Sequence, residues 1–166
     1  TIVVEKEKII IPYIQPKVFK DTNEMALSIG SKFKEKDMKP LPEGFDVSLK
    51  SIYFSFNKSD IRTDQQKIMD ANIKLIKENP NIIIKIIGHT DKVGSKEHNL
   101  KLSQKRAKSA VNYLVKKGVS LNQIVAVLSN GEDMAGERYK NEDGSDNIEK
   151  MEVSRRVDFY IIGKTK

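Results

Sequence analysis

Cysteine and tryptophan are both absent from this chain of 166 residues. Without cysteine, the chain forms no disulfide, no thiolate zinc site and no cysteine nucleophile. It also lacks any apolar run close to the roughly 18 residues of a membrane span, since the richest stretches, 9–11 and 82–87, are broken by Pro12 and Lys85. Hydrophobic residues still make up 38% of the chain. That share supplies a core and argues against disorder throughout.

Acidic residues are scarce in one part of the chain, and this scarcity explains the formal net charge of +7. Residues 85–117 carry nine Lys or Arg and only two acidic residues, whereas 132–152 carry three basic and eight acidic residues. A basic total suggests nucleic-acid binding, which is the alternative function considered for this chain. The basic segment holds one aromatic, Tyr113, and no RNA-recognition, KH or helix-turn-helix pattern. Nucleic acid is therefore not the expected partner.

Hydrophobic periodicity predicts an alternation of strands and helices from about residue 49 onward. Two helical crossovers between strands imply a mixed sheet with helices on one face, an α/β fold of the α+β sandwich type. The first helix is expected to begin with a capping box at 63–66, and a short helix is expected around Ile148. The expected strands are 52–56, 82–87, 124–128 and 153–161, and the main helices are 63–79 and 100–117.

The first 48 residues differ in pattern from the rest. Four prolines punctuate them, a short strand is expected at 9–11, and about two helical turns are expected at 24–34. We therefore divide the chain into an N-terminal arm, linker or domain remnant at 1–48 and a domain at 49–166.

Two charged side chains are expected close together where the strand at 82–87 leads into the helix at 100–117. Asp91 lies just past the strand, where open α/β sheets bind ligands. Arg106 follows Asn99 by seven residues, so both project from nearly one side of the helix. A carboxylate and a guanidinium near a helix N-terminus suit a zwitterion, with Asp91 on the ammonium and Arg106 on the carboxylate. The alternative is a structural ion pair between the two.

Other site chemistries fit the sequence less well. Two histidines, His89 and His98, lie nine residues apart without metal-ligand spacing, and His89 is expected to satisfy hydrogen bonds at the strand end. Ser103 has neither a histidine base on its face nor a nucleophile-elbow motif. We therefore expect no catalytic residue, no metal and no cofactor. Phe54 and Phe56 are expected to be core residues.

Four separated motifs occur in order: Tyr53-Phe54-Ser55-Phe56-Asn57-Lys58, Thr90-Asp91-Lys92-Val93-Gly94, the run from Asn99 to Ala107, and Arg155-Arg156-Val157. With these motifs, residues 49–166 resemble the OmpA-like peptidoglycan-binding domain family. The sequence departs from the family at Asn57, where many members have aspartate.

The resemblance implies non-catalytic binding of the peptidoglycan stem peptide, whose diamino acid, usually diaminopimelate, ends in a zwitterion. The family's aspartate and arginine roles carry over to Asp91 and Arg106, and Thr90, Asn99 and Arg155 match positions that line the family's pocket. The expected function is to anchor an envelope component to the wall, in the bacterial periplasm. Membrane association, for example as a lipoprotein, is expected only through segments outside this chain.

Overall fold

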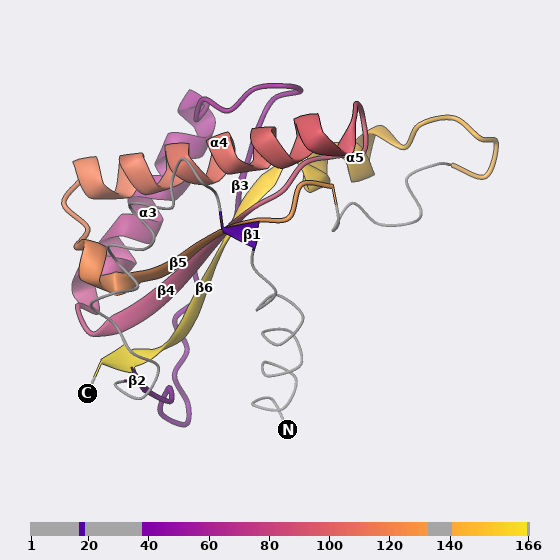
Figure 1. Ribbon diagram of the computed structural model, residues 1–166. Helices are drawn as coiled ribbons and strands as arrows, with labels where there is room; N and C mark the ends of the chain where they lie inside the picture. Colours follow the sequence, from indigo (N-terminus) through magenta and orange to yellow (C-terminus); the bar gives the residue numbers. More distant parts are fainter. Residues whose placement is uncertain (1–16, 19–37, 133–140, 166) are drawn as a thin grey trace.

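A computed structural model describes residues 17–18, 38–132 and 141–165 (Figure 1). The strands expected at 82–87, 124–128 and 153–161 and the helices expected at 63–79 and 100–117 are present, although the second helix begins earlier, at Lys96. The elements in chain order are β1 (Lys17–Val18), β2 (Met38–Lys39), β3 (Ile52–Tyr53), α3 (Thr63–Glu78), β4 (Ile82–Gly88), α4 (Lys96–Lys116), the short 3-10 helix η2 (Leu121–Gln123), β5 (Ile124–Ser129), α5 (Ile148–Ser154) and β6 (Arg156–Thr165).

The sheet is mixed, as the order of elements predicts. Its strand order is β1-β5-β4-β6-β2, and β3 also pairs with β6. Strand β4 runs parallel to β5 and antiparallel to β6. Strands β3 and β2 pair antiparallel with opposite ends of β6, through Ile52 with Val157 and Met38 with Thr165. The carboxyl end of β4 therefore lies beside β3 and the start of β6, and the candidate site lies there.

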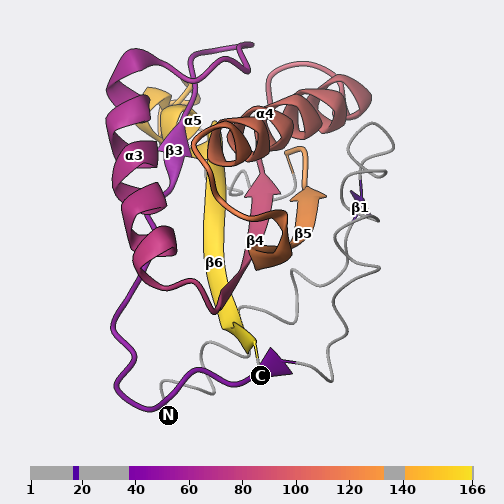
Figure 2. The same cartoon turned by 90° about the vertical axis from the view of Figure 1, so that its left-hand side faces the viewer.

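Helices α3 and α4 lie together on one face of the sheet (Figure 2). All seven residues of β4 are buried, as expected for a central strand covered on both faces. One stripe of α4, including Ala107, Ala110, Val111 and Leu114, is buried in the same core as Phe54. The α/β class with helices on one face is confirmed.

Helix α4 packs closely on the end of β4. A Cβ added at Gly88 would overlap the backbone carbonyl of Ser103, so this approach requires glycine at position 88. Ser95 caps the helix by accepting a hydrogen bond from the backbone N–H of His98 at 3.1 Å. Gly118 follows the helix with φ +94°, a left-handed conformation that commonly ends helices. The start of α4 is thereby fixed beside the end of β4.

Three local expectations are wrong. Helix α3 begins without a capping box: Arg62 is the N-cap residue and Thr63 lies inside the helix. The amide of Gln66 donates to the carbonyl of Ile61 instead of reaching back to Thr63. The first domain strand covers only 52–53, because the chain turns at 55–58.

The third difference is at the C-terminal strand. Val153 belongs to α5, so the strand begins at Arg156, while the helix expected around Ile148 is confirmed. The strand expected at 9–11 and the helical turns expected at 24–34 lie outside the described residues. Within the described part of the chain, no helix is long and apolar enough to cross a membrane.

Candidate functional site

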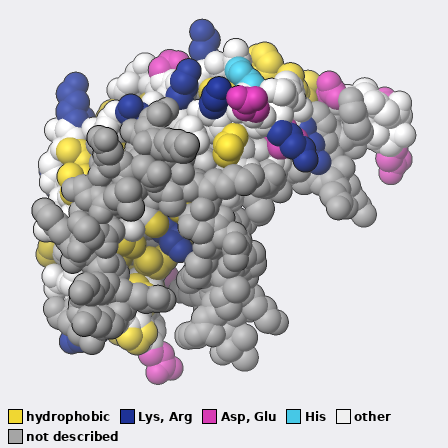
Figure 3. Space-filling view, in the orientation of Figure 1, with side chains coloured by type: hydrophobic (Ala, Val, Ile, Leu, Met, Phe, Trp, Pro, Cys, Tyr) yellow, Lys and Arg dark blue, Asp and Glu magenta, His cyan; other side chains and the backbone are white. Residues whose placement is uncertain are grey.

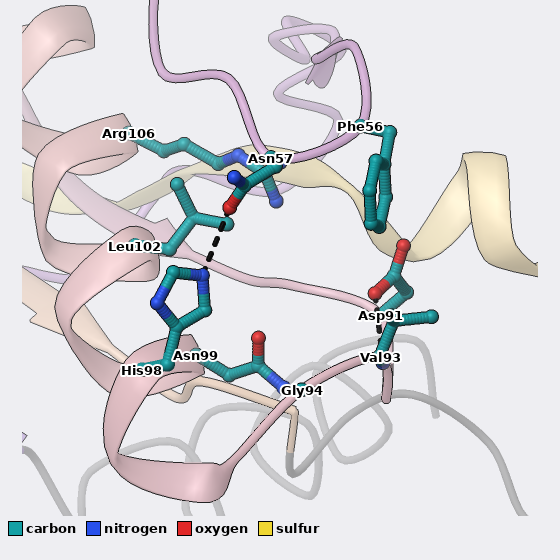
Figure 4. Close-up of a pocket in the computed structure, with 9 residues that line it drawn as sticks. All are labelled: Phe56, Asn57, Asp91, Val93, Gly94, His98, Asn99, Leu102 and Arg106. Atoms are coloured by element: carbon teal, nitrogen blue, oxygen red, sulfur yellow. Dashed lines mark hydrogen bonds between the residues drawn. The ribbon is translucent and has the colours of Figure 1, made fainter.

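A pocket of about 150 Å³ opens between the loop after β3, the loop after β4 and the first turns of α4 (Figure 4). Asp91, Val93 and Phe56 lie on one side of the space in this view, and Arg106, Leu102 and His98 lie on the other. Its lining residues are Phe56, Asn57, Asp91, Val93, Gly94, His98, Asn99, Leu102 and Arg106.

Asp91 is buried, with an exposed fraction of 3%. Its Oδ1 accepts a hydrogen bond from the backbone N–H of Val93 at 3.0 Å. Its Oδ2 accepts one from Arg155 Nη1 at 3.3 Å, which also makes an ion pair. Arg155 is held in turn by donating from Nε to the carbonyl of Phe54 at 3.1 Å. The carboxylate is thus fixed at the edge of the pocket by Arg155, just before β6, and by its own loop.

Arg106 is completely buried. Its guanidinium donates three hydrogen bonds to backbone carbonyls: Nε to Lys58 at 2.8 Å, Nη1 to His89 at 3.0 Å and Nη2 to Ser55 at 3.2 Å. Its Cζ also lies 5.3 Å from the centre of the Phe54 ring, within cation–π range. Burial lowers the pKa of Arg106 to about 10, against the opposing effect of Asp91. The side chain therefore stays protonated at neutral pH.

The turn at 55–58 forms the wall of the pocket in front of Arg106. Its closing hydrogen bond runs from the N–H of Lys58 to the carbonyl of Ser55 at 3.1 Å, and Asn57 has φ +54°. Because Arg106 binds the carbonyls at both ends of this turn, it holds Phe56 and Asn57 at the pocket. Asn57 Oδ1 lies 2.8 Å from His98 Nε2 across the rim, the dashed contact in Figure 4.

The first turn of α4 supplies the floor of the pocket. Gly94 has φ +96°, a conformation that favours glycine. Asn99 is buried and its amide donates to Glu132 Oε2 at 2.8 Å. The exposed backbone N–H groups of a helix start also carry partial positive charge. The polar floor and the acidic Asp91 face each other across a small space.

The structure brings together three of the five residues expected at the site. Asp91, Arg106 and Asn99 line the pocket. Thr90 is buried and donates from Oγ1 to the carbonyl of Asp91 at 2.9 Å. Arg155 reaches the pocket through its bond to Asp91.

Sequence reasoning missed several lining residues. Phe56 was expected in the core, but its exposed fraction is 54%, because the turn after Phe54 reverses the strand alternation. Leu102 and His98 were also not expected at the pocket. For Leu102 a signal was available, because it lies three residues after Asn99 and four before Arg106 on the same helix.

A second polar cluster lies behind the site. His89 is fully buried, and its Nε2 lies 2.9 Å from Asp158 Oδ2. Ser51 and Arg156 also donate to Asp158, at 2.6 Å and 3.1 Å. Burial raises the pKa of Asp158, but His89, Arg156 and Ser51 together hold it at about 2. Burial lowers the pKa of His89. Among the described residues, no group of three or more His, Cys, Asp or Glu side chains could hold a metal.

Comparison with known proteins places this geometry in a family. The sequence profile of the OmpA family matches residues 53–149. The chain belongs to the OmpA family. The matched range includes the pocket loops and helix α4, and it ends before strand β6.

Individual relatives agree with this membership. Outer membrane protein A of Klebsiella aerogenes is 40% identical over 85 residues, which are 48% of this chain and 23% of that protein. The peptidoglycan-associated lipoprotein of Pseudomonas putida is 35% identical over 86 residues, 52% of this chain and 51% of that protein. The chain therefore spans about half or less of the length of these relatives.

A solved structure shares the fold. The crystal structure of the peptidoglycan-associated lipoprotein from Burkholderia pseudomallei superposes with a TM-score of 0.56 and 28% identity. The match covers 66% of this chain and 86% of that one. The OmpA-like fold expected from the four motifs is therefore confirmed.

Proposed function

We propose that residues 49–166 bind peptidoglycan without catalysis and anchor a cell-envelope component to the wall, on the periplasmic side. The observation that carries this proposal is the placement of Asp91 and Arg106 on one pocket in a chain of the OmpA family. The names of the lipoproteins from Pseudomonas putida and Burkholderia pseudomallei add support, because both are peptidoglycan-associated.

The ligand we propose is the zwitterionic end of the stem-peptide diamino acid. Asp91 would receive its ammonium, because a carboxylate is the natural acceptor for that group and both of its oxygens are already oriented. The carboxylate of the ligand would face Arg106. Three of the five N–H donors of the Arg106 guanidinium are bound to carbonyls, and the side chain is fully buried behind the turn at 55–58. Its positive charge would therefore attract the ligand carboxylate through the pocket wall.

The size of the pocket supports an end group as the ligand. A space of about 150 Å³ accommodates the head of an amino acid. The proposal therefore places only the end of one stem peptide in the pocket, with the rest of the polymer outside.

Sedimentation with insoluble, diaminopimelate-type peptidoglycan tests the proposal. Wild type is expected to sediment, and Asp91→Asn and Asp91→Ala are expected to remain in solution. Asp91→Asn keeps the shape of the side chain, so circular dichroism should show an intact fold. Asp60→Asn is the matched control, because it removes an exposed carboxylate from the loop before α3. The proposal fails if folded wild type does not sediment, or if Asp91→Asn sediments as wild type does.

A further inference from the structure

Helix α4 carries a row of lysines on its outer face. Lys101, Lys105, Lys108 and Lys116, here called the lysine face, are all exposed. Their spacing of four, three and eight residues keeps them within about one third of the helix circumference, opposite the buried stripe. The row is about 22 Å long at 1.5 Å per residue. Figure 3 shows Lys and Arg side chains along the upper edge of the molecule, where α4 lies in Figure 1.

This positive charge is barely neutralised within the described part of the chain. Glu97 is the one acidic residue of α4, and its Oε1 lies 3.2 Å from Lys101 Nζ. In the described ranges, no carboxylate pairs with Lys105, Lys108 or Lys116. Like charges along one helix face repel each other and cost stability. The sequence nonetheless places all four on one face.

The lysine face adjoins the pocket. Leu102 lines the pocket and follows Lys101 directly in α4, beside the lysine face on the helix surface. Asn99 and Arg106, also from α4, line the pocket beside it. A polymer with one end group in the pocket would therefore have the first half of the lysine face within reach, because α4 forms one side of the pocket.

We propose that the lysine face is a second contact surface for peptidoglycan, and that it binds the carboxylates of stem peptides next to the one held in the pocket. This inference rests on the proposed function. Insertion of one stem peptide tethers its neighbours, so their effective concentration at the helix is high. Exposed ion pairs contribute little individually, but several along one polymer act together.

The experiment measures the apparent Kd for insoluble peptidoglycan at low salt and at about 0.5 M salt. The test variant is Lys101→Gln/Lys105→Gln/Lys108→Gln in the full chain. The matched control is Lys67→Gln/Lys74→Gln/Lys150→Gln, which removes three exposed lysines elsewhere. Both variants have the same net charge, so a difference between them reports position. Asp91→Asn, measured in parallel, reports on the pocket.

The test variant should bind about tenfold more weakly than wild type at low salt, and the control should bind within about twofold of wild type. At about 0.5 M salt the test variant should approach wild type, because screening removes the contribution of exposed charges. Equal weakening of both triple variants, or no weakening of the test variant, would overturn the inference.

Two further outcomes separate the inference from the proposed function. If Asp91→Asn abolishes binding while the lysine variant binds normally, the pocket stands and the lysine face fails. If vesicles of anionic lipid or a DNA duplex bind through the lysine face while peptidoglycan binding is unchanged in the lysine variant, the inference is also overturned. Normal binding by Asp91→Asn would refute the proposed function itself.

Discussion

Asp91 and Arg106 line one pocket without pairing with each other. Asp91 makes its ion pair with Arg155 at 3.3 Å, while Arg106 donates to the carbonyls of Ser55, Lys58 and His89. The structural ion pair considered from sequence is therefore not the role of Arg106. Its bonds join the turn at 55–58, the end of β4 and helix α4, so one buried cation builds the pocket wall.

This arrangement predicts that Arg106 is a stability residue as well as a pocket residue. Arg106→Ala should lower the free energy of unfolding by about 3–5 kcal/mol, because three carbonyls, that of His89 among them fully buried, lose their donor and a cavity replaces the side chain. Arg106→Lys should be nearly as damaging, since one ammonium cannot replace a fork bound to three acceptors. Urea denaturation measures both.

The control for Arg106 is its exposed neighbour. Lys105→Ala should stay within about 0.5 kcal/mol of wild type. If Arg106→Ala unfolds like wild type but fails to bind peptidoglycan, the guanidinium serves the ligand and its three carbonyl bonds contribute little. Equal losses for Arg106→Ala and Lys105→Ala would also contradict the structural role described above.

Periodicity and motif spacing were sufficient to predict the fold and the placement of Asp91 and Arg106 on one pocket. Both depend on regular geometry: a run of isoleucines forms β4, and seven residues along a helix bring Asn99 and Arg106 to one side. The turn at 55–58 could not be predicted in this way. The strand alternation continues through Phe56 in the sequence, but the carbonyl bonds to a distant arginine reverse the chain there. Such non-local contacts leave no periodic signal.

The buried pair of His89 and Asp158 predicts a specific dependence of stability on pH. In the unfolded chain His89 titrates near pH 6.5, whereas burial lowers its pKa in the folded protein. As pH falls below about 6.5, the unfolded state takes up the proton first, so stability decreases, by at most about 1.4 kcal/mol per pH unit. The loss is absent above about pH 7.5. Urea unfolding between pH 7.5 and 5.5 measures it.

Two histidine variants test whether His89 causes this pH dependence of stability. His89→Gln should flatten the curve between pH 7.5 and 5.5, and His98→Gln, at the exposed pocket rim, should keep the wild-type fall. Below about pH 4 a second loss is expected, because the contacts of Asp158 hold its folded-state pKa at about 2 despite its burial. A fall that persists unchanged in His89→Gln would show that other groups carry it.

Truncation before the domain tests its N-terminal boundary. Deleting residues 1–46 should preserve cooperative unfolding and peptidoglycan binding, because the pocket lies wholly within 56–106. It should still lower the free energy of unfolding by about 1–3 kcal/mol, since β2 pairs with β6 and Phe45 packs on the core. Deleting only 1–37 keeps both contacts and is the matched control. Loss of cooperative unfolding in the longer deletion would place the boundary before residue 46.

Substitution of the exposed Phe56 should change peptidoglycan binding without changing the stability of the fold. The ring lies next to the Asp91 carboxylate on the same side of the pocket (Figure 4), so a ligand ammonium at Asp91 would lie within reach of the aromatic ring. Phe56→Ala should leave the free energy of unfolding within about 0.5 kcal/mol of wild type and weaken peptidoglycan binding about three- to tenfold. Phe54→Ala, in the buried core, should instead destabilise by about 3–5 kcal/mol. Sedimentation and urea unfolding on the same preparations decide the matter, and unchanged binding by Phe56→Ala would remove the ring from the site.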